Sequence, residues 1–375
     1  MAVEWETVRL EFPSLANWTF LNTAAFGQLP KRATDSVKRH FEHRDELACA
    51  DFLDWFDDAD RIREQAARLI HCGSGDIAFI PNASTALSLL LGGIDWQPGD
   101  RIVTLEHEFP NNLYFPALLA RHGVEFVETS WDGFESAVDS RTRLIALSTV
   151  NYTNGFRPPL VEIGKLSRAR GALLYLDGTQ SVGALRFDCQ TVQPDILAVH
   201  GYKWLLSPNG AGFMYVSPAA RKWLAPNVVG WRSHYDWRNV DNLHHAAPEF
   251  KVTAEKYEGG MLNFSAIYAM SASIEMMLEI GPDVIEARVL ELAEMVRQVM
   301  RNAGAELPGD SLAHYESPIV AGRFPQVDAS RLALELKEQR VLVSARHGKL
   351  RVSTHFYNNE ENVERFGIAL RRALR

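Results

Sequence analysis

Lys203 is the residue whose position in the sequence most strongly suggests chemistry. It lies in the stretch VHGYKWLLSPNGAGF, directly after an apolar run that reads as a strand, with His200 and Tyr202 close beside it. An ammonium group is costly to bury without a partner. A desolvated lysine in a cationic neighbourhood has a lowered pKa, which an imine-forming lysine requires. We therefore interpret Lys203 as a Schiff-base lysine, the alternative being a solvated lysine at the end of a strand.

Asp177 ends a second apolar run, in the stretch LLYLDGTQSVGA, and Gln180 follows it within the same stretch. Taken alone, Asp177 could cap the helix that follows. A carboxylate at the ligand edge of a sheet could instead pair with a pyridine nitrogen and raise the pKa of that nitrogen. Gln180 could then donate a hydrogen bond to a phenolic oxygen of the same ring.

The stretch IAFIPNASTALSLLL predicts a strand, a short turn and then a helix. The free amides and the dipole at the N-terminus of a helix bind anions. Ala83, Ser84 and Thr85 occupy this turn, where two hydroxyl groups could also contact a phosphate. Ser84 could equally be a simple helix cap, and one helix start can serve both purposes.

A reactive amine, a carboxylate and a phosphate-binding turn are the groups that pyridoxal 5'-phosphate (PLP) requires. Together the three stretches resemble the class V aminotransferase family, which includes cysteine desulfurases, kynureninases and isopenicillin N epimerase-like proteins. The order of the motifs agrees with that family, and the resemblance covers nearly the whole chain. It implies a fold-type I PLP-dependent transferase that acts on an amino acid substrate.

The resemblance also implies roles for further residues on the cofactor side. Tyr202 would touch the phosphate, and His200 would lie against the cofactor beside it. In LEHEFPNNLYFP, either His107 or Phe109 would stack on the cofactor ring, and the EFPNN context favours Phe109. Asn151, in VNYTNGF, would contact the phenolic oxygen.

On the substrate side, the resemblance assigns Arg351 of LRVSTHFYNNEENVERF to the substrate carboxylate, which an arginine can bind through two parallel hydrogen bonds. Ala25, in FLNTAAFGQLP, would line the substrate side, and Asn263 would lie near it. Fold-type I sites form at a dimer interface, so a homodimer is implied. Met261 and Leu262 stand where the family has threonine and proline, which leaves the contact with the partner's phosphate open.

Strands and helices alternate over residues 1–263, and this alternation predicts a mostly parallel central sheet with helices on both faces. Ligands bind at the carboxyl ends of such strands, where the candidate residues lie. The expected strands are 77–80, 101–105, 144–149, 173–176, 196–199 and 212–216, and the expected helices include 84–91, 113–121 and 163–170.

Residues 264–375 predict a smaller C-terminal α+β domain, because the pattern changes after residue 263. Two long helices are expected first, broken by a Gly-Pro pair, and an amphipathic helix is expected to close the chain. The expected helices are 265–280, 284–303 and 359–374, and the expected strands are 319–321, 341–344 and 350–353.

Composition and charge argue against several classes of partner and site. The chain of 375 residues has a net charge of −8, which indicates no nucleic-acid partner. Its three cysteines form no close pair in the sequence, so we expect neither a disulfide framework nor a metal site. The absence of a long apolar run argues against a membrane partner, and we expect a cytoplasmic protein.

The reaction is the least determined feature of the sequence. We favour transamination, with epimerisation or a lyase reaction as the alternative, and a PLP-binding sensor without turnover as a third possibility. Cysteine desulfuration is not expected, because the loop VSARHGKLRVS has no cysteine where desulfurases carry their catalytic one.

Overall fold

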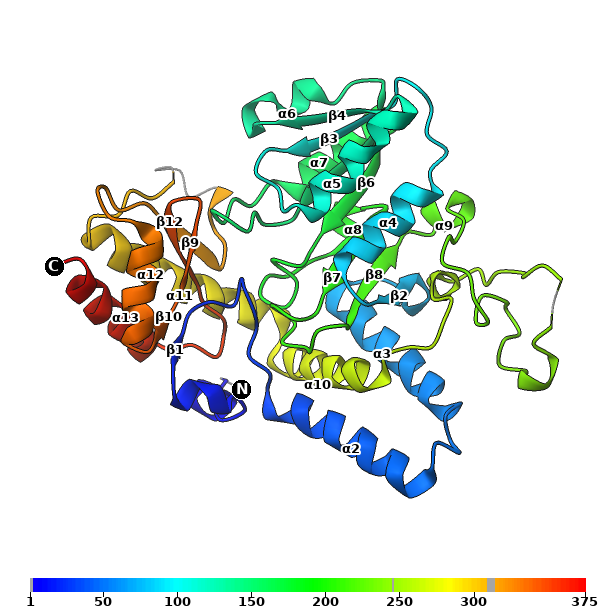
Figure 1. The fold of residues 1–375 in the computed structure, drawn as a ribbon, viewed down its shortest axis with the longest axis horizontal. Helices are drawn as coiled ribbons and strands as arrows, with labels where there is room; N and C mark the ends of the chain where they lie inside the picture. The colour runs from blue at the N-terminus through cyan, green and yellow to red at the C-terminus, as the bar shows by residue number, and fades with distance from the viewer. Residues whose placement is uncertain (1–2, 245, 309–313) are drawn as a thin grey trace.

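The computed structural model describes residues 3–244, 246–308 and 314–375. At its centre lies a sheet of seven strands in the order β2-β8-β7-β6-β5-β3-β4 (Figure 1). β8 is antiparallel to both of its neighbours and the other pairs are parallel, so the predicted mostly parallel sheet is confirmed. The strands are, in that order, Ile77–Ile80, Gly212–Val216, Ile196–His200, Leu173–Asp177, Thr142–Ser148, Arg101–Leu105 and Glu125–Thr129.

Helices cover both faces of this sheet, and the side chains of β7 alternate between them. Leu197 faces a hydrophobic core that includes α3 (Asp54–Ile70) and α10 (Phe264–Ile280). Ala198 faces the opposite core, which includes α4 (Ala83–Gly93). Strands buried on both faces read as continuous apolar runs, which is why the sequence pattern locates them.

The C-terminal part contains a second, smaller sheet in the order β11-β12-β9, which lies apart from the central sheet in Figure 1. All its neighbouring strands are antiparallel. Three helices enclose a separate hydrophobic core with this sheet. These elements are β9 (Ile319–Gly322), β11 (Ser344–Arg346), β12 (Lys349–Ser353), α11 (Pro282–Asn302), α12 (Ala329–Glu338) and α13 (Glu360–Ala373).

The N-terminal segment joins this smaller unit. β1 (Thr19–Phe20) pairs in parallel with β10 (Val341–Leu342), and Leu21 lies in the core of the smaller unit. In turn, α10 packs mainly on α2 (Lys31–Leu47) and on α3. The division into residues 1–263 and 264–375 therefore stays a prediction, because contacts cross it from both sides.

Two predictions of local structure require correction. A single strand over 341–344 is wrong: β10 pairs with β1, and β11 begins two residues later in a different sheet. β4 was not predicted, because its sequence EFVET lies at the sheet edge and exposes its glutamates. An edge strand is buried less on one side and so lacks a continuous apolar run.

The other helices connect these layers. No helix among the described residues is long and apolar enough to cross a membrane. The remaining α-helices are α1 (Trp5–Arg9), α5 (Asn111–Leu118), α6 (Trp131–Ala137), α7 (Leu160–Arg170), α8 (Cys189–Val192) and α9 (Ala220–Trp223). Short 3₁₀ helices are Pro13–Ala16, Ser74–Asp76, Leu119–His122, Val240–Asn242 and Ala254–Tyr257.

The fold brings together two cysteines that are far apart in the sequence. Cys72 follows α3, and Cys189 begins α8. A hydrogen bond with Cys72 raises the pKa of the Cys189 thiol, and burial raises it further. Both are free thiols.

A network of buried charges anchors the segment after α9, residues 224–244, which extends away from the sheet (Figure 1). The guanidinium group of Arg232 donates hydrogen bonds to Glu255 Oε1 and Glu258 Oε2, both at 3.1 Å. Glu258 also accepts a hydrogen bond of 2.5 Å from Arg63 of α3. Breaking a buried ion pair of this kind costs about 3–5 kcal/mol, so the network holds the segment firmly at its base.

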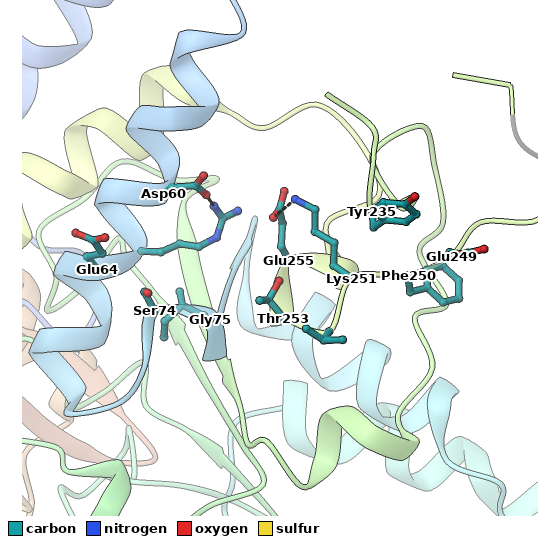
Figure 2. Close-up of a pocket in the computed structure, with 13 residues that line it drawn as sticks. Asp60, Glu64, Ser74, Gly75, Tyr235, Glu249, Phe250, Lys251, Thr253 and Glu255 are labelled. Carbon is teal, nitrogen blue, oxygen red and sulfur yellow. Dashed lines mark hydrogen bonds and ion pairs between the residues drawn. The ribbon is translucent and has the colours of Figure 1, made fainter. Parts of the chain in front are cut away.

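Figure 2 shows an open cavity beside this network. Lys251 Nζ lies 2.6 Å from Glu255 Oε2, and Asp60 pairs with Arg63 at 2.6 Å. The residues that line this cavity do not include Lys203. We therefore assign these charges to the anchoring of the segment. Lys203 lines a different cavity.

Candidate active site

The candidate site forms where β5, β6 and β7 end and α4 begins. This is the carboxyl edge of the sheet, where parallel strands place ligand-binding residues. A cavity of about 200 Å³ lies there. It is lined by Asn82, Ala83, Ser84, Phe109, Asn111, Ser148, Tyr152, Asp177, Thr179, Gln180, His200, Tyr202 and Lys203.

Lys203 lies in the turn after β7, and its side chain is 6% exposed. Burial lowers the pKa of its amine to about 8, opposed by Asp177 and reinforced by Arg351. The Nζ atom lies 5.5 Å from the ring centre of Phe109 and 5.2 Å from that of Tyr202. The amine is thus desolvated and surrounded by rings, as an imine-forming lysine requires.

The N-terminal segment packs against the backbone of this lysine. The amide of Gly27 donates a hydrogen bond to the carbonyl of Tyr202 at 2.9 Å. A Cβ atom at position 27 would lie 1.9 Å from the carbonyl oxygen of Lys203, so only glycine fits there. Ala25 lies in a turn two residues before Gly27, so the N-terminal segment passes beside the site. Ala25 itself does not line the cavity.

Asp177 is the last residue of β6 and is 5% exposed. Its Oδ1 accepts a hydrogen bond from the amide of Thr179 at 2.9 Å. Burial raises the pKa of its carboxyl group, whereas the hydrogen bonds from Thr179 and the charge of Lys203 lower it. A cationic ring nitrogen beside this carboxylate would keep it ionised and would itself stay protonated.

The buried Gln180 and the half-buried His200 have unused hydrogen-bonding capacity. Gln180 Oε1 accepts a hydrogen bond from Trp204 Nε1 at 2.9 Å, and its Nε2 donates to the carbonyl of Ala24 at 3.1 Å. One amide hydrogen of Gln180 remains for a ligand. His200 Nε2 is buried without a partner, and burial followed by the charge of Lys203 lowers the pKa of His200 to about 4.

The start of α4 supplies the candidate phosphate site. Asn82 Oδ1 caps the helix by accepting a hydrogen bond from the amide of Thr85 at 2.9 Å. The first amides of the helix, at Ala83 and Ser84, have no acceptor within the helix and face an anion-binding position. Ala83 and Ser84 line the cavity, whereas Thr85 hydrogen-bonds to Asn82.

Phe109 lines the lysine cavity, whereas His107 lines a neighbouring one with Asn151. The carbonyl of His107 accepts a hydrogen bond from Asn151 Nδ2 at 3.0 Å. Asn151 Oδ1 in turn accepts from the amide of Thr153 at 2.9 Å. This arrangement favours Phe109 as the ring-stacking residue. The Asn151 side chain joins the loop that contains His107 to the loop that contains Thr153.

Glu108 holds the loop that carries Phe109, a role that the sequence did not suggest. Its buried carboxylate accepts hydrogen bonds from the amide of Ser148 at 2.6 Å, from Ser148 Oγ at 2.5 Å and from Asn112 Nδ2 at 3.0 Å. Burial raises its pKa, and the hydrogen bonds from Ser148 oppose that shift. Glu108 thereby ties the end of β5 to the loop after β3 and orients Phe109.

Arg351 of β12 is 1% exposed and reaches the rim of the site. Its Nε donates to Ser344 Oγ at 3.0 Å, and one terminal nitrogen donates to the carbonyl of Tyr152 at 2.6 Å. The other terminal nitrogen is buried without a partner. Burial, and next the charge of Arg346, lowers the pKa of Arg351 to about 9. A carboxylate would satisfy both the free nitrogen and the charge.

Asn263 lies at the surface, at the start of α10. Its side chain caps this helix and accepts a hydrogen bond from Ser265 Oγ at 3.0 Å. Neighbouring Met261 is 58% exposed, and neither residue lines the cavity of the single chain. The role of Asn263 in substrate binding therefore stays a prediction that depends on a second subunit.

The cavity thus brings together eight of the predicted residues and adds others. The eight are Ala83, Ser84, Phe109, Asp177, Gln180, His200, Tyr202 and Lys203. Outside its lining lie Ala25, Thr85, His107, Asn151, Asn263 and Arg351. Sequence reasoning missed Asn82, Asn111, Ser148, Tyr152 and Thr179. Each of the missed residues lies beside a predicted residue or at a strand end, and the strand-end rule could have found Ser148 and Thr179.

Known proteins are similar to this chain in sequence and in architecture. The family described as "Aminotransferase class-V" matches residues 19–366. Isopenicillin N epimerase of Streptomyces clavuligerus is 30% identical and aligns with 99% of this chain and 98% of its own. A probable cysteine desulfurase of Methanothermobacter thermautotrophicus is 26% identical, with 97% of each chain aligned.

Solved structures show the same fold. The apo cysteine desulfurase of Thermococcus onnurineus superposes with a TM-score of 0.88 at 20% identity, over 99% of this chain and 98% of its own. The cystine C-S lyase C-DES, in complex with cysteine persulfide, superposes with a TM-score of 0.86 at 21% identity, over 96% and 99% of the two chains. This chain is therefore a member of the class V aminotransferase family, with the fold-type I architecture of its PLP-dependent enzymes.

Proposed function

We propose that the protein is a PLP-dependent aminotransferase that acts on an amino acid, with Lys203 as its Schiff-base lysine. The observation that carries the proposal is the buried amine of Lys203, whose pKa is lowered to about 8. It shares one cavity with the Asp177 carboxylate and with the start of α4. An amine, an acid and an anion site within one small cavity match the three ends of the PLP molecule.

The chain's own residues have separate tasks in this proposal. When bound, PLP supplies an electron sink that stabilises negative charge at the α carbon of an amino acid. Asp177 would pair with the ring nitrogen and keep it protonated, and Phe109 would pack against the ring. Arg351 binds the α-carboxylate through its free terminal nitrogen. Lys203 moves the proton at the α carbon, as general base and then as general acid.

Transamination is favoured over epimerisation by the acid–base groups that line the cavity. Lys203 has a pKa near neutrality, at about 8, whereas that of His200 is lowered to about 4 and that of Tyr202 is raised. Moving a proton on and off both faces of the α carbon is easiest with two titrating groups, and only Lys203 among these three titrates near pH 7. Epimerisation stays the second candidate, because the relative that is 30% identical is named an epimerase.

Cysteine desulfuration is not part of the proposal, although several relatives are named for it. A desulfurase needs a reactive thiol that can reach its substrate. All three cysteines lie within the described residues, and none of them lines the cavity of Lys203. Cys72 and Cys189 instead interact with each other, where α3 ends and α8 begins. A lyase reaction and a PLP-binding sensor without turnover remain as lesser alternatives.

We also propose that the protein is a cytoplasmic homodimer. Large apolar side chains are exposed on the segment that joins α9 to α10, and Val252 among them is 87% exposed. A second subunit that covered these side chains would remove their apolar surface from water. We refer to them together as the exposed apolar patch: Val228, Val229, Trp231, Tyr235, Val240, Leu243, Phe250, Val252 and Met261.

Replacing Lys203 by alanine should abolish cofactor attachment and lower turnover by roughly 10²- to 10⁴-fold or more, because the proton-moving group is lost. Purified wild-type protein with PLP should be yellow, and borohydride reduction followed by peptide mapping should label Lys203. Lys222→Ala, at an exposed position of α9, is the matched control and should keep the spectrum. An unchanged spectrum in Lys203→Ala would refute the assignment.

The rate at which the apoprotein takes up PLP should rise with pH, with a midpoint of about 8. The reason is that only the neutral amine attacks the aldehyde, and burial lowers the pKa of Lys203 from 10.5 to about 8. Asp177→Asn should shift the midpoint to lower pH, since the Asp177 charge raises this pKa. Stopped-flow absorbance between pH 6.5 and 9.5 measures both, and a wild-type midpoint near the ordinary lysine value would contradict the burial argument.

A screen of L-amino acids should show that an amino group passes to a 2-keto acid, with no release of ammonia. Chromatography of the keto acid formed and of the new amino acid measures this transfer. Loss of optical rotation without transfer would instead establish epimerisation, and release of ammonia in the absence of a keto-acid acceptor would establish an eliminating lyase. A yellow protein that converts no amino acid would favour the sensor.

Sedimentation equilibrium should give twice the chain mass of 42.1 kDa, because the exposed apolar patch needs a partner. A value of a single chain at micromolar concentration would count against the homodimer and against a shared site at Asn263.

A further inference from the structure

The hairpin of β11 and β12 presents positive charge on one face. Ser344 pairs with Arg351 and Arg346 pairs with Lys349 across this antiparallel ladder. Residues directly opposite each other, and residues two apart on one strand, point to the same face. Three cationic side chains therefore share the face on which Arg351 reaches the candidate site.

The hydrogen bonds of Arg351 show that this face is directed toward the cofactor cavity. Ser344 Oγ, on the same face, accepts from Arg351 Nε at 3.0 Å, and the carbonyl of Tyr152 accepts from a terminal nitrogen at 2.6 Å. Tyr152 itself lines the cavity. Arg346 is diagonal to Arg351 in the ladder, a separation of roughly 7–8 Å between backbone positions.

A row of aromatic rings links the hairpin turn to the ring-stacking position. Phe109 contacts Tyr152, with ring centres 5.2 Å apart. The Tyr152 hydroxyl lies 3.3 Å from His347 Nε2, in the turn directly after Arg346. The His347 and His107 rings lie 6.4 Å apart. Arg346 directly precedes His347, the residue at which this row of rings reaches the hairpin turn.

Neither arginine is neutralised by the protein. Among the ion pairs between described residues, Arg346 and Arg351 have no carboxylate partner. Arg346 donates to the carbonyl of Ala345 at 2.7 Å, and a terminal nitrogen of Arg351 is buried with no acceptor. The charge of Arg346 reaches both Arg351 and Lys203, since it lowers the pKa of each.

Two neighbouring guanidinium groups repel each other, and an anion between them or on each of them removes the repulsion. A substrate with a single carboxylate can neutralise Arg351 but leaves Arg346 without an anionic partner. A substrate with a second anionic group can satisfy both, because its two charges can span neighbouring positions of the ladder.

We infer that the substrate is an amino acid whose side chain ends in an anionic group, its α-carboxylate bound by Arg351 and its side-chain anion bound by Arg346. This inference rests on the proposed function, since it assigns the amino-acid substrate of that same site. Arg346 is the residue that selects the substrate, and Arg351 is the residue that binds every substrate.

The first test compares acidic amino acids with their neutral amides, which have nearly the same shape. The wild-type holoenzyme should prefer aspartate over asparagine, or glutamate over glutamine, by roughly 10- to 100-fold in kcat/KM, the range for a hydrogen bond to a charged group. Arg346→Gln should remove this preference and leave the amide rates within about twofold. Arg346→Lys should retain part of it, because the charge remains but the planar fork is lost.

Two further variants serve as controls. Arg351→Gln should lower kcat/KM for the acid and the amide alike. Arg331→Gln, at an exposed position of α12 whose side chain pairs with Glu335, should change neither. Equal rates for acid and amide in the wild type, or an equal loss of both in Arg346→Gln, would overturn the inference.

The second test measures binding without turnover. Calorimetry on the holoprotein should show that glutarate binds at least tenfold more tightly than butyrate, and that Arg346→Gln removes the difference. Equal affinities in the wild type would overturn the inference even if an aminotransferase activity is found. If no amino acid is converted but glutarate binds through Arg346, the proposed function fails. The inference that Arg346 and Arg351 bind two anionic groups of one ligand then still holds.

Discussion

The burial of the Lys203 amine is the constraint on which the rest of the site depends. An amine in water is protonated at neutral pH and cannot attack an aldehyde, so the chain must remove water from it. Burial lowers the pKa of this amine, and the Asp177 carboxylate opposes that effect. The resulting pKa of about 8 is a compromise between desolvation and attraction. It leaves an amine that can react and can also carry a proton.

The residues that surround Lys203 come from distant parts of the chain. Asp177 and His200 end neighbouring parallel strands, so they meet at one edge of the sheet. Gly27, from the N-terminal segment, packs directly on the carbonyl of Lys203. Arg351 comes from the smaller sheet and is joined to the large one through the carbonyl of Tyr152. No single element contains the site, which explains why contacts cross the proposed domain boundary.

Relatives with this fold carry different names: epimerase, desulfurase and lyase. The shared scaffold therefore fixes the cofactor's surroundings, and the groups at the rim decide the reaction. Here the rim has no thiol within the cavity lining and carries Arg346, Arg351 and His347 on one hairpin. The positive charge of this hairpin is the observation on which the proposed recognition of acidic groups rests.

The sequence alone determined six of the seven strands of the central sheet, the fold class and eight residues of the cavity. Strands such as Ile77–Ile80 and Gly212–Val216 are buried on both faces, so their apolar runs show their bounds. Only the tertiary structure decided the pairing of β1 with β10, the contact of Cys72 with Cys189 and the support of Phe109 by Glu108. Such contacts join residues far apart in the chain, or depend on which way a side chain points, and neither leaves a periodic signal in the sequence.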